Sequence, residues 1–238
     1  MATALPAAGT RDPPHRPAVT LFPSPNFGDR RGQRPRLVVI HYTAMASCAE
    51  ARDRLCDPAA EVSAHWLVDR DGGAESLVDE AFRAWHAGAG AWGGQGDVNS
   101  RSIGIELQNC GDEPFAEAQM AALEGLLAGI LARWSIPPQG VIGHSDMAPD
   151  RKGDPGPRFD WRRLALAGLS VWPVPRAPGD FRADLRRFGY PDLPEAVLLH
   201  AFRLRFRPWA RGPQDATDAA LAADLAARFG VDAGGAGA

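Results

Sequence analysis

The alternation of short apolar segments with a long amphipathic segment most restricts what this chain can fold into. The run Leu37 to Ile40 is short and continuously apolar, which is typical of a buried strand. Apolar residues recur at three- and four-residue spacing over residues 116–134, which predicts a helix with one buried face. Residues 65–69 and 74–78 flank an Asp-Gly turn and predict a hairpin. The pattern therefore predicts an α/β fold with a mixed central β-sheet flanked by helices.

Composition along the chain predicts three regions. Residues 1–34 are rich in Pro, Ala, Gly and Arg without periodicity and predict a loose N-terminal arm, docked at Pro23 to Phe27. Residues 35–172 carry the α/β pattern and form the main domain. After a Pro-rich linker, residues 180–236 hold three amphipathic stretches (180–188, 194–206 and 216–229) and predict a small helical C-terminal domain. No oligomeric state is predicted.

Two expectations concern side chains of the second stretch of that C-terminal domain. His200 lies on its apolar stripe, which predicts a core position. The alternating Arg203, Arg205 and Arg207 predict a solvated face.

Charge and cysteine content exclude several classes of protein. The 26 Lys and Arg residues against 29 Asp and Glu residues give a net charge of −3, so no nucleic-acid partner is predicted. Three cysteines without a CxxC pair indicate free thiols in a reducing compartment. Charged residues and prolines interrupt the first twenty positions, and no apolar run is long enough for a membrane span. We therefore predict a cytoplasmic protein without membrane insertion, with the periplasm as the alternative.

Polar residues with catalytic potential follow the predicted strands. His41 comes directly after the first strand, and His144 follows the short strand Val141-Ile142, so both reach a sheet edge where ligands bind in α/β folds. Two histidines and one carboxylate such as Asp154 are the ligand set of a catalytic zinc, which keeps a fourth position open. From spacing alone, two unrelated histidines and a turn aspartate would be the favoured interpretation. Glu106 adds weight, because a carboxylate in an otherwise apolar strand is costly unless it is paired or functional.

Four segments in the same order resemble the zinc-dependent N-acetylmuramoyl-L-alanine amidases of the type 2, AmpD/AmiD-like group, which is related to T7-type lysozyme and peptidoglycan recognition proteins. They are Val39-Ile40-His41-Tyr42-Thr43, Ala84-Trp85-His86-Ala87-Gly88, Ser102-Ile103-Gly104-Ile105-Glu106-Leu107, and the block from Gly143 to Pro157. The last block is highly specific, and the resemblance covers roughly residues 23–170.

The resemblance implies a role for each matching position. His41, His144 and Asp154 match the family's Zn²⁺ ligands, Glu106 its catalytic glutamate and Lys152 its catalytic lysine. The implied activity is hydrolysis of the amide between the lactyl group of N-acetylmuramic acid, in its ordinary or its 1,6-anhydro form, and L-alanine. The implied partner is a muropeptide or peptidoglycan fragment, in cell wall recycling.

Other positions have two interpretations each. Tyr42, Trp85, His86 and Asn99 are candidate substrate-binding residues, with plain packing about equally favoured for Trp85 and His86. Trp92 would stack on a sugar or fill a gap. The C-terminal domain resembles a degenerate peptidoglycan-binding module, or it is a packing appendage.

Two alternatives to the amidase remain from the sequence. A non-catalytic peptidoglycan recognition module of the same fold would lack one or more ligands, whereas all five matching residues are present here. A zinc amidohydrolase for an unrelated small amide has the same chemistry.

Overall fold

The computed structural model describes residues 19–231 of the chain. Eight strands are present in that range: β1 (Val19–Leu21), β2 (Phe27–Gly28), β3 (Leu37–Tyr42), β4 (Trp66–Val68), β5 (Ala74–Ser76), β6 (Arg83–Ala84), β7 (Ser102–Leu107) and β8 (Val141–Gly143). The α-helices of the same range are α1 (Cys48–Cys56), α2 (Val98–Arg101), α3 (Glu117–Trp134), α4 (His144–Met147), α5 (Trp161–Leu166), α6 (Phe181–Phe188), α7 (Glu195–Phe206) and α8 (Ala216–Phe229). Two short 3₁₀ turns, Pro58–Ala60 and Pro138–Gly140, complete the set.

Six of the strands form one mixed sheet in the order β1-β5-β4-β7-β3-β8. Strands β4, β7, β3 and β8 run parallel, whereas β4 and β5 form the predicted antiparallel hairpin. The register places His41 of β3 directly opposite Glu106 of β7. Strands β2 and β6 pair separately as a two-stranded antiparallel sheet.

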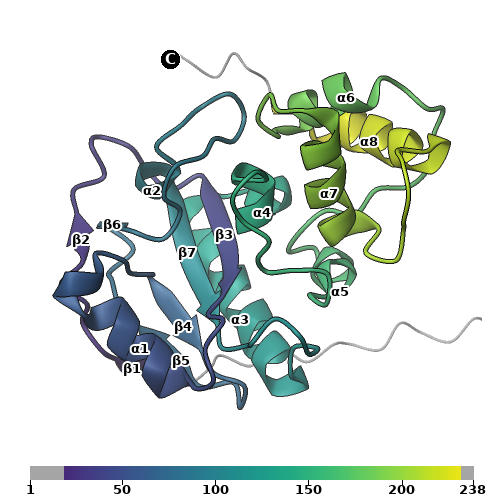
Figure 1. Ribbon diagram of the computed structural model, residues 1–238. Helices are drawn as coiled ribbons and strands as arrows, with labels where there is room; N and C mark the ends of the chain where they lie inside the picture. The colour runs from purple at the N-terminus through teal and green to yellow at the C-terminus, as the bar shows by residue number, and fades with distance from the viewer. Residues whose placement is uncertain (1–18, 232–238) are drawn as a thin grey trace, which may run out of the picture.

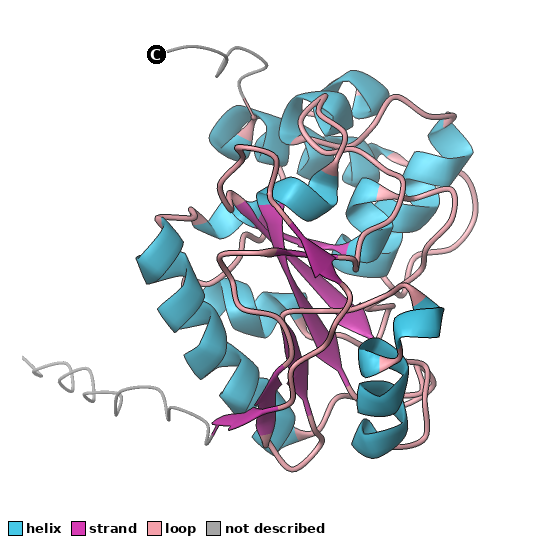
Figure 2. Ribbon diagram, turned by 90° about the vertical axis from the view of Figure 1, so that its left-hand side faces the viewer, coloured by secondary structure: helices cyan, strands magenta, loops and turns pink. Residues whose placement is uncertain are grey.

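Each face of the sheet is covered by helices, which confirms the predicted fold class. Val38 and Ile40 of β3 pack into the apolar cluster that includes the buried face of α3. Leu37 and Val39 belong to a second cluster, on the opposite face, which extends to α4 and the C-terminal helices. Figure 2 shows helices on either side of the strands, and Figure 1 shows α4 beside β3.

Residues 19–34 show the predicted docking at Pro23 to Phe27 and add a strand to the sheet, whereas residues 1–18 of the predicted arm lie outside the described range. Strand β1 joins the main sheet through parallel pairing with β5. Ser24 Oγ donates to the carbonyl oxygen of Leu55 at 2.6 Å, and Asn26 Nδ2 donates to Asp57 and Val62 carbonyl oxygens, both at 2.8 Å. These side chains satisfy carbonyl groups near the end of α1, so the segment is docked where the sequence predicted.

Helices α6, α7 and α8 match the three predicted stretches and gather beside α4 and α5 (Figure 1). Their apolar residues share one buried cluster with Leu37, Val39 and Ile142 of the sheet. The proposed division into separate domains therefore stays a prediction.

Three side chains of α7 differ from expectation. His200 is exposed rather than in the core. Arg203 and Arg205 are 8% and 2% exposed, so the predicted solvated face is wrong for both. Each reaches a buried aspartate, and this pairing makes burial of the guanidinium tolerable.

Within the described range, no helix combines the length and apolar character needed to cross a membrane.

Candidate active site

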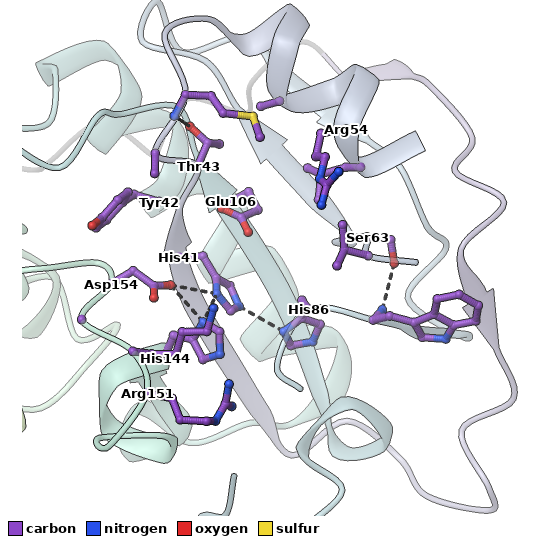
Figure 3. Close-up of a pocket in the computed structure, with 18 residues that line it drawn as sticks. His41, Tyr42, Thr43, Arg54, Ser63, His86, Glu106, His144, Arg151 and Asp154 are labelled. Carbon is purple, nitrogen blue, oxygen red and sulfur yellow. Dashed lines mark hydrogen bonds and ion pairs between the residues drawn. The ribbon is translucent and has the colours of Figure 1, made fainter. Parts of the chain in front are cut away.

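Three predicted metal ligands meet at one edge of the sheet. His41 is the penultimate residue of strand β3, His144 begins α4 directly after β8, and Asp154 comes from the following loop. The backbone amide of Ser145 holds this loop by donating to the Asp154 carbonyl oxygen at 2.9 Å. One ligand atom from each of the three lies within 4.8 Å of the others. Figure 3 shows the two rings and the carboxylate pointing toward one another. Parallel pairing of β3 with β8 is what brings residues 103 positions apart to the same edge.

Hydrogen bonds determine which nitrogen of His144 is free. Its Nε2 lies 2.9 Å from the carbonyl oxygen of Ala87. Because a carbonyl can only accept, Nε2 carries the hydrogen, and Nδ1 of the neutral ring keeps a lone pair.

A chain of three contacts determines the same for His41. Ser102 Oγ donates its only hydrogen to the Val98 carbonyl oxygen at 2.6 Å, so it accepts from His86 Nε2 at 3.1 Å. His86 Nδ1 is then an acceptor, and His41 Nε2 donates to it at 3.0 Å. His41 Nδ1 is left with its lone pair, as for His144.

The arrangement of these atoms fits a divalent cation. The Nδ1 atoms of His41 and His144 are 2.9 Å apart, and Asp154 Oδ2 lies 3.0 and 3.1 Å from them. Burial, together with the neighbouring His144, lowers the pKa of His41 to about 4, so its ring stays neutral at physiological pH. Lone pairs and a carboxylate at these distances repel one another unless a positive charge lies between them. Two imidazole nitrogens and one oxygen make the three-ligand set of catalytic zinc sites, with a further position open.

Electrostatics keep Asp154 ionised. Burial alone would raise its pKa, but the side chains of His144 and His41 beside the carboxylate outweigh this effect and hold the pKa well below its usual range. An ionised carboxylate is the form that coordinates a metal.

Glu106 lies beside this cluster with a different charge state. Its register partner is His41, and its Oε2 atom is buried without a hydrogen-bond partner among residues 19–231. Burial first, then the negative charge of Asp154, raises the pKa of Glu106 to about 8, while Lys152 opposes the rise. A carboxyl group whose pKa lies near neutrality suits both taking up and releasing a proton.

A cavity of about 440 Å³ opens onto the cluster. His41, Glu106, His144 and Asp154 line it together with four of the other predicted site residues: Tyr42, Trp85, His86 and Lys152. Its lining also includes Arg54 of α1 and Arg151, neither of which the sequence predicted (Figure 3).

Asn99 and His86 stabilise the site through hydrogen bonds to its backbone and to His41. Asn99 does not line the cavity: its Oδ1 accepts from the backbone amides of His86 and Ala87 at 3.0 and 2.8 Å. His86 packs against Gly104, where a Cβ atom would lie 2.3 Å from its Cγ. Ser102 and the Ala87 carbonyl complete this support, and sequence reasoning missed both because the contacts join distant segments.

The protein-family model described as N-acetylmuramoyl-L-alanine amidase matches residues 31–157, more than half of the chain. The chain belongs to this amidase family. It is therefore an amide hydrolase, as the resemblance implied.

Similar proteins support this assignment over most of the chain. N-acetylmuramoyl-L-alanine amidase AmiD of Escherichia coli K12 is 37% identical in an alignment 240 positions long, which covers 84% of this chain and 85% of AmiD. The structure of E. coli AmiD in complex with the substrate anhydro-N-acetylmuramic acid-L-Ala-D-gamma-Glu-L-Lys has a TM-score of 0.76 at 34% identity, and covers 87% of this chain and 99% of that one. AmpDh3 of Pseudomonas aeruginosa in complex with anhydromuramic pentapeptide has a TM-score of 0.74 at 30% identity, covering 88% and 96%.

Proposed function

We propose that this amidase uses zinc to hydrolyse the amide between the lactyl group of N-acetylmuramic acid and L-alanine in muropeptides. The observation that carries the proposal is the convergence of two Nδ1 lone pairs and the Asp154 carboxylate at a cavity that also contains Glu106. Support for the substrate class comes from AmiD and AmpDh3, whose structures hold anhydromuramyl peptides.

His41, His144 and Asp154 would hold the zinc ion. When bound, zinc polarises a carbonyl group and lowers the pKa of a coordinated water to about 7. Glu106 would accept a proton from the water that attacks the lactyl carbonyl carbon and pass that proton to the alanine nitrogen as the C–N bond breaks. The products are the free lactyl carboxylic acid and the free amine, which accounts for both hydrogens of the water.

Lys152 lies at the exposed side of the cavity, where its ammonium group would stabilise the negative charge that develops on the carbonyl oxygen. Tyr42 and Trp85 would contact the substrate, since both are half-buried in the cavity wall. His86 and Asn99 would act through the protein instead, because their polar atoms are engaged with His41 and with the loop backbone.

Mass spectrometry of the products from a defined anhydromuramyl peptide tests the proposal. We expect an intact sugar and an intact peptide, with no products after treatment with a chelator and full recovery after zinc is added. Glu106→Gln should keep zinc binding and lose most turnover.

Glu75→Gln is a matched control, since Glu75 is a half-buried carboxylate of the same sheet that pairs with Arg52 outside the cavity. Equal turnover by Glu106→Gln and the parental protein would disprove the role of Glu106.

The same experiment separates the alternatives. A recognition module would bind the muropeptide without releasing products, and a general amidohydrolase would cleave simple acyl-alanines as fast as the muropeptide. The cytoplasmic location stays a prediction, which cell fractionation tests; a periplasmic result would favour intact murein or its fragments as substrate.

A further inference from the structure

Helix α7 carries two buried arginines that reach in different directions. Arg203 pairs with Asp218 of α8, with 2.5 Å between Nη2 and Oδ2. Arg205 reaches out of the C-terminal helices, and its Nη1 lies 2.5 Å from Oδ2 of Asp146 in α4. Its Nη2 also donates to the Val141 carbonyl oxygen at 3.1 Å and to Ser170 Oγ at 3.2 Å. The guanidinium therefore joins α7 to both β8 and α4.

Asp146 links this arginine to the metal-ligand candidate His144, two residues earlier in the same short helix. The backbone amide of Gly143, directly before His144, donates to Asp146 Oδ2 at 2.7 Å. The Tyr190 hydroxyl, from the turn after α6, donates to Oδ1. Side chains of Asp146 and Arg205 are 0% and 1% exposed, so both oxygens of a fully buried carboxylate are occupied by partners. The first turn of α4 is thus held from the C-terminal helices.

The same helices also support the second contact of His144. Trp92 is 2% exposed and packs between Phe188 and Tyr190, with ring centroids 5.4 and 5.3 Å away. Gly189 makes this possible, because a Cβ atom there would lie 2.4 Å from the Trp92 ring. Trp92 therefore fills a gap, and its loop begins at Ala87, whose carbonyl oxygen accepts from His144 Nε2.

We infer that the C-terminal helices are a positioning element of the active site, in which Arg205 and Tyr190 orient His144 through Asp146. The inference rests on the proposed role of His144 as a metal ligand. It assigns to α6–α8 a function that needs no contact with peptidoglycan.

Zinc affinity and the visible spectrum of the cobalt-substituted protein test the inference without relying on turnover. Arg205→Met should weaken zinc binding by about 10-fold, the lower end of the effect that direct outer-shell partners of metal ligands have, because Arg205 acts on His144 through Asp146. It should also alter the cobalt absorption bands, which report ligand geometry. Arg205→Lys should restore part of the affinity, since an ammonium group keeps the charge but cannot reach Asp146 and the Val141 carbonyl together as the two guanidinium nitrogens do.

Arg203→Met is the matched control, because it breaks an equally close buried pair of the same helix that does not contact α4. We expect it to lower stability while zinc affinity and the cobalt spectrum stay unchanged. Equal losses of zinc affinity in Arg203→Met and Arg205→Met would overturn the inference and leave only a general effect on stability.

Tyr190→Phe decides the question if Arg205→Met does not fold, since it removes one hydroxyl from the same network. A several-fold loss of zinc affinity with a changed cobalt spectrum supports the inference, and unchanged values refute it. His144→Ala separates this test from the proposed function: if zinc binds as tightly without His144, the metal site itself is wrong, whichever result Arg205 gives.

Discussion

Substitution of Gly104 by alanine should damage the proposed metal site by displacing His86. The backbone φ of Gly104 lies outside the left-handed region, so alanine introduces no backbone strain there. The new methyl group, however, would lie 2.3 Å from Cγ, 2.6 Å from Cδ2 and 2.7 Å from Nδ1 of His86. No carbon atom tolerates such contacts, and Nδ1 is the atom that accepts from His41. The imidazole must therefore move away from His41.

We expect two measurable effects from this displacement. Overpacking should lower the free energy of unfolding by about 1–3 kcal/mol in the metal-free protein, as measured by urea denaturation. Loss of the His41–His86 hydrogen bond should weaken zinc binding about 10–100-fold, as measured by competition with a chelator.

Gly129→Ala makes the same chemical change, but we expect it to have the opposite effect on the free energy of unfolding. Gly129 lies inside α3, and its new methyl group would meet only the flexible end of Arg133 at 3.0 Å. Alanine should stabilise this helix by about 0.5–1 kcal/mol and leave zinc binding unchanged. Unchanged stability and zinc affinity in Gly104→Ala would refute the close contact between His86 and β7.

Three further predictions concern the same neighbourhood. Burial, with the charge of Arg30 adding to it, lowers the pKa of His65 to about 3, so below about pH 6.5 the unfolded chain takes up a proton that the folded protein does not. The free energy of unfolding, measured by urea titration, should therefore fall by about 1.4 kcal/mol per pH unit from pH 6.5 toward pH 3. This contribution should vanish in a His65→Gln variant. Ser102→Ala leaves the His86 Nε2–H without its acceptor and should lower the free energy of unfolding by about 1–3 kcal/mol in the same urea titrations. An unchanged urea midpoint would contradict this prediction. Zinc should raise the melting temperature in proportion to the logarithm of its free concentration, whereas a protein lacking His144 should show no such rise in calorimetry.

Local pattern was enough to predict most of the elements. The apolar spacing of 116–134 predicted α3, which begins at Glu117 and ends at Trp134. The Asp-Gly turn predicted the β4–β5 hairpin, and the three C-terminal stretches match α6–α8 to within about one residue. These predictions succeed because a helix or a hairpin is specified by neighbours in the sequence.

Predictions that depended on long-range contacts succeeded only in part. Docking at Pro23 to Phe27 was predicted, but strand β1 and the partners of this segment were not, because those partners lie near the end of α1 and in β5. Arg203 and Arg205 were predicted to be solvated because their aspartate partners lie 15 and 59 positions away in the sequence. No local rule detects such a partner, and an arginine is ordinarily exposed without one.

The sequence by itself determined most of the secondary structure, the family and the residue types of the proposed metal site, since each of these depends on local spacing or on a specific motif. Only the tertiary structure decided how His41 and His144 present their Nδ1 atoms. Those orientations follow from Ser102, His86 and the Ala87 carbonyl, which reach the histidines by the packing of separate strands and loops. The attachment of α4 to the C-terminal helices is likewise a property of the packed molecule, because its charges become close partners only after both segments are buried.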